Sequence, residues 1–154
     1  MDARDVIRIG MNAERMLVVP PEQTVGHFVA GMPMVFATPM MILQMELTSG
    51  DAIRDHLAPG WVTVGTEVNI KHLAASPVGA TVRTTAKVIA VERRVIRFEV
   101  ASFEGERKIG EGFHGRGLVN VALEISKGRF TEYGVSRAGK LRGRASGQAK
   151  EQKP

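Results

Sequence analysis

The sequence contains no cysteine. Disulfide bonds, thiol nucleophiles and thiolate metal sites are therefore excluded, and a reducing compartment such as the cytoplasm is expected. Four scattered histidines without an HExxH-type spacing predict neither a metal site nor a bound cofactor. No run approaches the roughly 18 consecutive apolar residues of a membrane-spanning helix, and the first ten residues lack the layout of a signal peptide. The sequence predicts no membrane partner.

Aromatic residues are scarce, at 5%, and the basic residues are unevenly distributed. Residues 127–154 hold eight Lys or Arg and two Glu, whereas residues 1–126 hold 13 basic and 14 acidic residues. The positive charge belongs to a tail rich in Gly, Ser, Ala, Gln and Lys, which buries too little apolar surface to fold alone. With few aromatic residues for base stacking, we expect a solvated, disordered extension and no nucleic-acid partner. Residues 1–126 are expected to form one folded domain.

The first half of the domain shows one strand candidate and one long helix. Residues 14–19 (ERMLVV) are apolar from Met16 onward and end at a pair of prolines, which favours a short strand. Residues 38–57 are predicted as a helix, because Thr38 suits the N-cap and Pro39 suits the first helical position. We expect this helix to be apolar over nearly its whole circumference.

After Gly60 the pattern changes to an alternation of period two, which indicates strands. Four strands are predicted, at residues 61–73, 80–92, 94–103 and 108–124. Short turns join them, so an antiparallel meander is favoured. In the first of these strands, we expect the residues from Val62 to His72 at even positions to face inward and Gly65 to face the opposite way. One long central helix wrapped by such a sheet predicts an α+β fold with the outline of a hotdog domain.

Glu46 follows directly after an apolar stretch of the predicted helix. A carboxylate among apolar neighbours is costly unless it is paired, hydrogen-bonded or protonated. No Lys or Arg occurs between Arg15 and Arg54, so the partner of Glu46 must come from elsewhere in the fold or from another subunit. His72 is one candidate, and a Glu and His pair in an apolar pocket favours a functional site.

Thr38, Gly65 and His72 are the other candidates for chemistry. His72 is either a hydrogen-bonded core residue or a general base. Thr38 lies at a helix N-terminus, where free N–H groups favour a developing oxyanion, and about 12 Å of straight helix separates it from Glu46. Gly65 interrupts a strand rich in Val and Thr, which marks either close packing or a backbone N–H beside a ligand. This constellation favours acyl transfer or hydrolysis.

Three stretches then resemble a known family: VFATPMMILQME, LAPGWVTVGTEVNIKHLAASPVGATV and RFEVASFEGERKIGEGFHGR. They resemble the fluoroacetyl-CoA thioesterases and the wider set of hotdog thioesterases, over residues 18 to 121. The resemblance implies an acyl-CoA thioesterase that hydrolyses a thioester to the free acid and CoA. It also implies a homodimer or a dimer of dimers, with each site at the subunit interface.

The resemblance implies roles for individual residues. Thr38, Glu46 and His72 match the family's catalytic Thr, Glu and His. Gly65 matches the Gly whose backbone lies beside the thioester, and Arg116 matches an Arg near the acyl group. Attack by water activated by His72 and Glu46, and attack by a side chain through an acyl-enzyme, both stay open.

One departure from the family concerns the lid over the acyl group. The fluoroacetate-specific enzyme uses Phe residues ahead of its catalytic Thr, whereas this sequence has Val29, Met32 and Met34 there. Methionine is flexible and fills irregular space, so a less selective gate is expected, with Met32 part of the substrate-binding surface. We therefore expect an acyl-CoA other than fluoroacetyl-CoA.

Two other functions remain as alternatives. A hotdog domain can be a non-catalytic acyl-CoA-binding module, because a fold does not determine a function. The stretch SGDAIRDH at residues 49–56 also resembles the SGDxNPxH signature of hotdog enoyl-CoA hydratases, with Ile53 and Arg54 in place of Asn and Pro.

Overall fold

The computed structural model describes residues 1–130, 133–135 and 141–143. The chain divides into two compact units, Met1–Val119 and Asn120–Pro154, and each is described by itself. Most of the tail that we predicted to be disordered, residues 127–154, lies outside the described residues. None of the described helices is long and apolar enough to cross a membrane.

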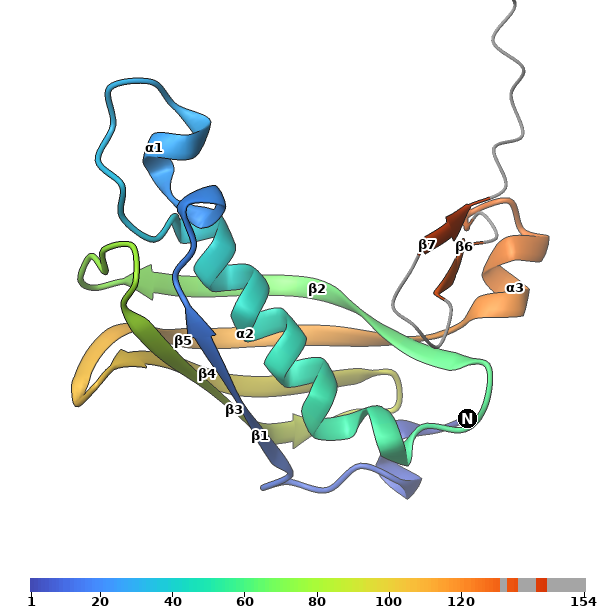
Figure 1. The fold of residues 1–154 in the computed structure, drawn as a ribbon. Helices are drawn as coiled ribbons and strands as arrows, with labels where there is room; N and C mark the ends of the chain where they lie inside the picture. The colour runs from blue at the N-terminus through green and yellow to red at the C-terminus, as the bar shows by residue number, and fades with distance from the viewer. Residues whose placement is uncertain (131–132, 136–140, 144–154) are drawn as a thin grey trace, which may run out of the picture. The chain divides into compact units, whose positions relative to one another are not determined.

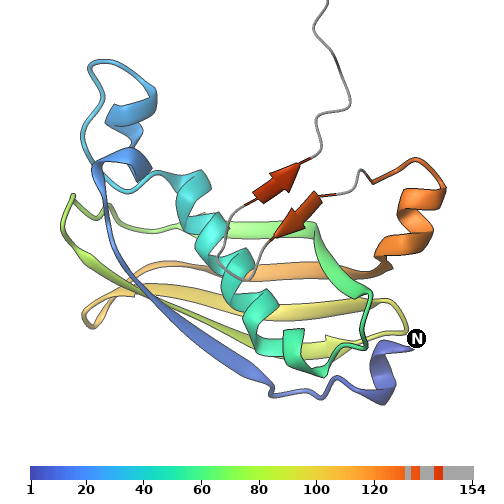
Figure 2. The same cartoon turned by 45° about the vertical axis from the view of Figure 1, so that its right-hand side comes forward.

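The first unit consists of a five-stranded sheet and one long helix. The strands are β1 (Asn12–Val18), β2 (Trp61–His72), β3 (Thr81–Val91), β4 (Val95–Glu104) and β5 (Arg107–Asn120). Their order in the sheet is β1-β3-β4-β5-β2, and the pairs from β1 to β5 are antiparallel. The long helix α2 (Thr38–Ile53) runs diagonally across one face of this sheet (Figures 1 and 2). The predicted α+β arrangement of an antiparallel sheet around one long helix is therefore confirmed.

Four shorter helical elements accompany them: η1 (Ala3–Asp5), η2 (Pro21–Gln23), α1 (Val25–Phe28) and η3 (Arg54–His56). The helix α2 begins one residue earlier than predicted, because Ala37 has the extended conformation of an N-cap and Thr38 is already helical. The Thr38 hydroxyl therefore makes no capping hydrogen bond and is available for another contact. Gly50 does not interrupt the helix.

The buried side of α2 packs on the sheet, and its other side does not. Seven residues repeat at helical spacing on the buried side: Met41, Gln44, Met45, Thr48, Ser49, Ala52 and Ile53. The hydroxyl groups of Thr48 and Ser49 donate to carbonyls one turn back, which satisfies them within the core. Leu43 on the other side is 38% exposed. The helix thus carries apolar side chains on its exposed side as well as on its buried side, as expected, and the sheet of the single chain covers only the buried side.

The alternation of side chains along β2 shifts by one residue within the strand, whereas we predicted an uninterrupted alternation. Thr63 and Gly65 face α2, since Thr63 bonds to Arg116 below the helix and a Cβ at Gly65 would overlap the Glu46 carboxylate. His72 also faces α2 although its position has the opposite parity. A Cβ at Gly115 would contact both Thr66 and Glu67, so these consecutive residues lie on the same, outer face. This is the geometry of a β-bulge, which shifts the alternation by one residue.

The strand β5 ends at Asn120 and not at residue 124 as predicted. Asn120 caps the short helix α3 (Val121–Ser126), because its side-chain oxygen accepts a hydrogen bond of 3.0 Å from the Leu123 N–H. The second unit also contains β6 (Tyr133–Val135), which pairs antiparallel with β7 (Leu141–Gly143).

The short turn predicted between the third and fourth strands of the meander, which are β4 and β5, is confirmed. Gly105 in this turn has a φ of 60°, which favours glycine.

Candidate active site

Thr38 and His72 form a hydrogen-bonded pair at the start of α2. The Thr38 hydroxyl oxygen lies 2.7 Å from Nδ1 of His72, which is the last residue of β2. Nε2 of His72 is buried and has no hydrogen-bond partner among the described residues. Burial lowers the pKa of His72 below its usual 6.5, against an opposing contribution from the Ala74 backbone. The pair therefore combines a hydroxyl with a neutral imidazole. In such a pair the imidazole can act as general base, either for the hydroxyl as nucleophile or for a water molecule beside it.

An open pocket of about 380 Å³ adjoins this pair. It is lined by Val25, Val35, Phe36, Thr38, His72, Leu73, Ala74 and Ala75. The walls are apolar apart from the Thr38–His72 pair, which fits an apolar group held beside a polar reaction centre.

The segment between α1 and α2 lies ahead of this pocket and exposes several apolar side chains. Phe28, Val29, Met32 and Met34 are between 46% and 59% exposed. The segment closes on itself, because Val25 and Gly26 donate backbone hydrogen bonds to Val35 and Pro33. Met32, expected at the substrate-binding surface, thus lies in a compact loop with its side chain half exposed.

Glu46 lies in the third turn of α2 with its side chain 34% exposed. Its carboxylate accepts no hydrogen bond from the described part of the chain, and Nε2 of His114 lies 3.9 Å from its Oε1, which is an ion pair only when that ring is protonated. Gly65 faces the carboxylate so closely that any Cβ there would overlap Oε1. The close backbone approach that we expected at Gly65 is therefore an approach to Glu46. His72, the partner that we considered, makes no contact with Glu46 among the described residues.

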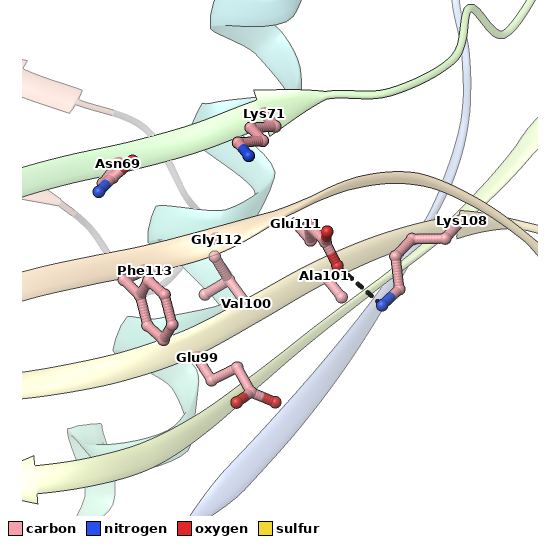
Figure 3. A pocket seen from close by; sticks show the side chains of 9 residues that line it. All are labelled: Asn69, Lys71, Glu99, Val100, Ala101, Lys108, Glu111, Gly112 and Phe113. Carbon is pink, nitrogen blue, oxygen red and sulfur yellow. Dashed lines mark hydrogen bonds and ion pairs between the residues drawn. The ribbon is translucent and has the colours of Figure 1, made fainter.

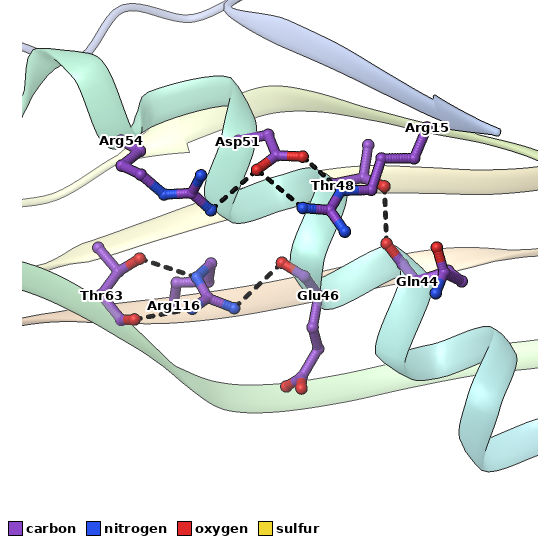
Figure 4. A network of polar contacts seen from close by, with 8 residues as sticks. All are labelled: Arg15, Gln44, Glu46, Thr48, Asp51, Arg54, Thr63 and Arg116. Carbon is purple, nitrogen blue, oxygen red and sulfur yellow. Dashed lines mark hydrogen bonds and ion pairs between the residues drawn. The ribbon is translucent and has the colours of Figure 1, made fainter. Parts of the chain in front are cut away.

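Arg116 lies below Glu46 and is almost fully engaged by protein groups (Figure 4). Its Nε and Nη2 donate to the side chain and carbonyl of Thr63, at 2.8 and 2.7 Å. Its Nη1 donates to the Glu46 carbonyl at 3.3 Å and lies 3.2 Å from Nε2 of His114. Burial lowers the pKa of Arg116, which remains cationic, while attraction to Glu46 acts in the opposite direction. Figure 4 shows the Glu46 carboxylate directed away from the guanidinium.

His114 is a site residue that we did not predict. It is 2% exposed, and its Nδ1 lies 2.9 Å from the Glu67 carbonyl oxygen. A signal was present in the sequence, because His114 lies two residues before Arg116 in a strand and so shares its face. The alternation alone could not indicate that this face meets Glu46.

The candidate residues therefore form two groups in one chain. The first is the Thr38–His72 pair at the start of α2, and the second is the Glu46 cluster, which we define as Glu46, Gly65, His114 and Arg116. About 12 Å of helix separates the backbone positions of Thr38 and Glu46. In the described chain no side chain connects the two groups.

The hydratase alternative depends on Asp51 and His56, which stand at the Asp and His of that signature, as acid and base. Both oxygens of the Asp51 carboxylate are engaged, by Arg15 from β1 and by Arg54 from the end of the helix (Figure 4). The hydrogen bond from Arg15 lowers the pKa of Asp51 below its usual 3.8. This carboxylate is held as an ion-pair partner, so the geometry disfavours a proton-transfer role.

A second hollow, of about 580 Å³, lies on the other face of the sheet (Figure 3). Side chains of Asn69 and Lys71 from β2 and of Lys108, Glu111 and Phe113 from β5 surround it. No residue of α2 lines it, and Lys108 and Glu111 pair with each other at 2.9 Å. None of the candidate residues reaches this hollow. Within the described residues, no three His, Asp or Glu side chains are grouped so that they could hold a metal ion.

Comparison with known proteins identifies the family. The model of the fluoroacetyl-CoA-specific thioesterase family matches residues 19–122. The fluoroacetyl-CoA thioesterase of Streptantibioticus cattleyicolor is 36% identical over 124 residues, which are 77% of this chain and 89% of that protein. A solved structure of the fluoroacetyl-CoA thioesterase FlK is 35% identical, with a TM-score of 0.75 over 80% of this chain and 96% of that one.

More distant structures agree. A thioesterase-superfamily protein of Thermus thermophilus is 29% identical, with a TM-score of 0.73 over 80% of this chain and 91% of that one. A hot-dog-like protein from Thermanaerovibrio acidaminovorans, at 20% identity and a TM-score of 0.77 over 86% of this chain and 99% of that one, shows the fold. The predicted hotdog fold and the predicted resemblance are both confirmed. The chain belongs to the fluoroacetyl-CoA-specific thioesterase family of hotdog-fold thioester hydrolases.

Proposed function

We propose that this protein hydrolyses an acyl-CoA thioester to the free acid and CoA, at a site built around the Thr38–His72 pair. The observation that carries the proposal is the 2.7 Å contact between the Thr38 hydroxyl and His72 beside an open apolar pocket. Structures of relatives in complex with acetyl-CoA and with CoA support an acyl-CoA substrate. A cysteine-free enzyme with such a substrate fits the cytoplasm.

The start of α2 supplies a donor for the oxyanion. Pro39 has no N–H, and the N–H groups of Met40 and Met41 both donate to the Ala37 carbonyl. The Thr38 N–H has no partner among the described residues. It lies at the N-terminus of the helix, which is the positive end of the helix dipole. Stabilisation of a tetrahedral oxyanion by one such donor is typically about 3–4 kcal/mol. Thr38 thus offers its backbone N–H as a donor to the oxyanion and its side-chain hydroxyl as the hydrogen-bond partner of His72.

His72 takes the proton of the attacking group. If Nδ1 accepts from Thr38, the threonine oxygen attacks the thioester carbonyl and its proton passes to Nδ1. The C–S bond breaks, CoA leaves with that proton, and water then hydrolyses the acyl-enzyme to the free acid. If Nδ1–H donates to Thr38, the basic lone pair is on Nε2, which is buried in the single chain. Water must then gain access to Nε2 before it gives up its proton there and attacks the thioester carbonyl, and CoA leaves as the C–S bond breaks. The Glu46 carboxylate is the second group that can orient or activate water.

We propose that two copies of the chain complete each site. The Thr38–His72 pair and the Glu46 cluster do not meet within one chain, and Glu46 has a partly exposed carboxylate without a hydrogen-bond donor among the described residues. The strand β2 is at the edge of the sheet and exposes Val62 and Val64, which are 39% and 38% exposed. A second copy paired along this edge hydrogen-bonds its free backbone N–H and C=O groups and extends the sheet, as a homodimer or within a dimer of dimers.

We further propose that the acyl group is larger and more apolar than fluoroacetyl. The pocket beside Thr38 is open and several times larger than a two-carbon acyl group needs. The flanking loop presents Met32 and Met34, whose flexible side chains adapt to different acyl groups. This argument concerns specificity alone and leaves the chemistry at Thr38 and His72 unchanged.

The first experiment follows release of free CoA with a thiol reagent over acyl-CoAs from acetyl to palmitoyl, with phenylacetyl-CoA and fluoroacetyl-CoA included. The absence of cysteine removes background from the protein. We expect turnover that falls at least about 100-fold in Glu46→Gln and in His72→Ala. Binding of an acyl-CoA without cleavage of any would instead identify a binding module. A clear preference for fluoroacetyl-CoA would contradict the proposed specificity.

A hybrid dimer tests whether two copies share a site. Thr38→Ala and Glu46→Gln chains carrying different tags are co-expressed and the hybrid is purified. If each site takes Thr38 from one copy and Glu46 from the other, the hybrid has one intact site and one with both defects. We expect about half of the parental activity in the hybrid and almost none in either variant alone. If each site lies within one copy, both sites of the hybrid are defective and no activity returns.

A further inference from the structure

We infer that His114 is a positioning residue for Glu46 and that it acts through Arg116. The inference rests on the proposed function, in which the Glu46 carboxylate works on the substrate or on water. His114 itself is buried below Glu46 and does not line the pocket beside Thr38.

The hydrogen bonds of His114 determine which of its nitrogen atoms carries the proton. The Glu67 carbonyl can only accept, so Nδ1, at 2.9 Å, must carry a hydrogen and donate it. The Arg116 guanidinium can only donate, so Nε2, at 3.2 Å, must have its lone pair free and accept. Both contacts are satisfied together in one state alone, the neutral imidazole protonated on Nδ1.

The surroundings of the ring favour the same state. The charged groups that face it are Arg116 on its own strand and Glu46 on α2. From β2 it meets the Glu67 carbonyl, and from β4 the ring of Phe98, with 6.4 Å between the ring centroids. Burial lowers the pKa of His114, and the Arg116 cation acts in the same direction, against the hydrogen bond to the Glu67 carbonyl and the charge of Glu46, which raise it.

This arrangement controls what Arg116 offers to Glu46. Nη1 has two hydrogens, of which one goes to Nε2 of His114 and the other to the Glu46 carbonyl. Neither is then available to the Glu46 carboxylate, which stays without a donor among the described residues. Without the acceptor on His114, a buried guanidinium N–H would lack a partner, and the Glu46 carboxylate, whose Oε1 lies 3.9 Å from Nε2 of His114, is an acceptor that can turn toward it. His114 thus keeps the carboxylate free of an ion pair.

Two substitutions test the contributions of the two ring nitrogen atoms separately. His114→Gln places an amide oxygen near the position of Nε2, so Arg116 keeps its acceptor. His114→Asn keeps a donor near the position of Nδ1 and removes that acceptor. We expect kcat to fall about 10- to 100-fold in His114→Asn with KM changed less than about threefold, and kcat of His114→Gln to stay within about threefold of the parent.

Equal losses in both variants, or parental kcat in both, would overturn the inference. A loss that appears in KM alone would do so too, because it would mean that the ring acts on substrate binding. Circular dichroism and thermal unfolding identify a variant that does not fold, in which case the measurement below decides.

The ¹⁵N spectrum of the histidine side chains tests the arrangement without any activity. The chain has four histidines, and the signal missing from His114→Gln identifies His114. We expect a protonated Nδ1 and an unprotonated Nε2 at neutral pH. A protonated Nε2 would overturn the inference. If the parent cleaves no acyl-CoA, the proposed function fails, whereas the spectrum still decides whether His114 holds Arg116 in this way.

Discussion

The hydroxyl of Thr38 and the imidazole of His72 meet at 2.7 Å, although 34 residues separate them in the sequence. Thr38 is available for this contact because Ala37, and not Thr38, caps the helix. His72 is available because the bulge at Thr66 and Glu67 turns the end of β2 toward the helix start. Two local departures from regular structure thus create one reactive pair.

Removal of the Thr38 hydroxyl is expected to lower kcat for CoA release by at least about 100-fold in Thr38→Ala. Thr38→Ser keeps an oxygen in reach of His72 and should retain activity within about tenfold. Thr48→Ala is the matched control on the same helix, since its hydroxyl only donates to the Gln44 carbonyl and its loss should affect stability but not kcat. Full activity in Thr38→Ala would leave the pair without a catalytic role.

The pH dependence of turnover should report the neutral form of His72. Because burial lowers the pKa of this imidazole, its neutral form persists below pH 6.5, and activity should reach half of its maximum on the acid side at a pH below that value. A profile of kcat/KM from pH 4.5 to 8 measures this. An acid limb centred above pH 6.5 would contradict the burial argument.

Gly65→Ala should disable the Glu46 cluster with little effect on folding. A Cβ at this position overlaps Oε1 of Glu46, so the carboxylate must move, and a displacement of about 1 Å can lower kcat about 100-fold. Gly50→Ala is the control, because a Cβ there meets only the end of the Arg54 side chain at 3.8 Å. It should raise the free energy of unfolding by about 0.5–1 kcal/mol and leave kcat unchanged.

Asp51→Asn should lower stability and spare activity. The ion pair with Arg15 is partly exposed, with side chains 34% and 23% accessible, so we expect a loss of about 0.5–1 kcal/mol in the free energy of unfolding at pH 7. The pKa of Asp51 is lowered in the folded state, so this contribution is present above pH 3.8 and disappears as the pH falls through the lowered value. Urea unfolding at several pH values measures it. Hydration of an enoyl-CoA by the parent protein, lost in this variant, would revive the hydratase alternative.

The sequence predicted the elements better than their faces. Alternation and turn residues located β2 to β5 because each strand has its own periodic pattern. The Thr-Pro signal located the start of α2 to within one residue, whereas α2 ends at Ile53 and the rest of the predicted helix up to His56 is the 3-10 helix η3. A bulge adds one residue without changing composition, so the face of His72 relative to Gly65 could not be read from alternation. The residues that lie beside Glu46 could not be predicted from the sequence for a different reason. They come from β5, and neither helical spacing nor proximity in sequence relates His114 and Arg116 to Glu46.

The bulge at Thr66 and Glu67 also bears on how this chain can change in evolution. Gly65 lies on one side of the bulge and serves the Glu46 cluster, whereas His72 lies on the other side and serves Thr38. Deletion of one residue between them would restore regular alternation and turn one of the two groups to the wrong face while the other stayed in place. Substitutions between Gly65 and His72 can accumulate one at a time without moving either group. A single insertion or deletion there inactivates the enzyme in one step. We expect natural variants to differ here in residue type and to keep the same spacing.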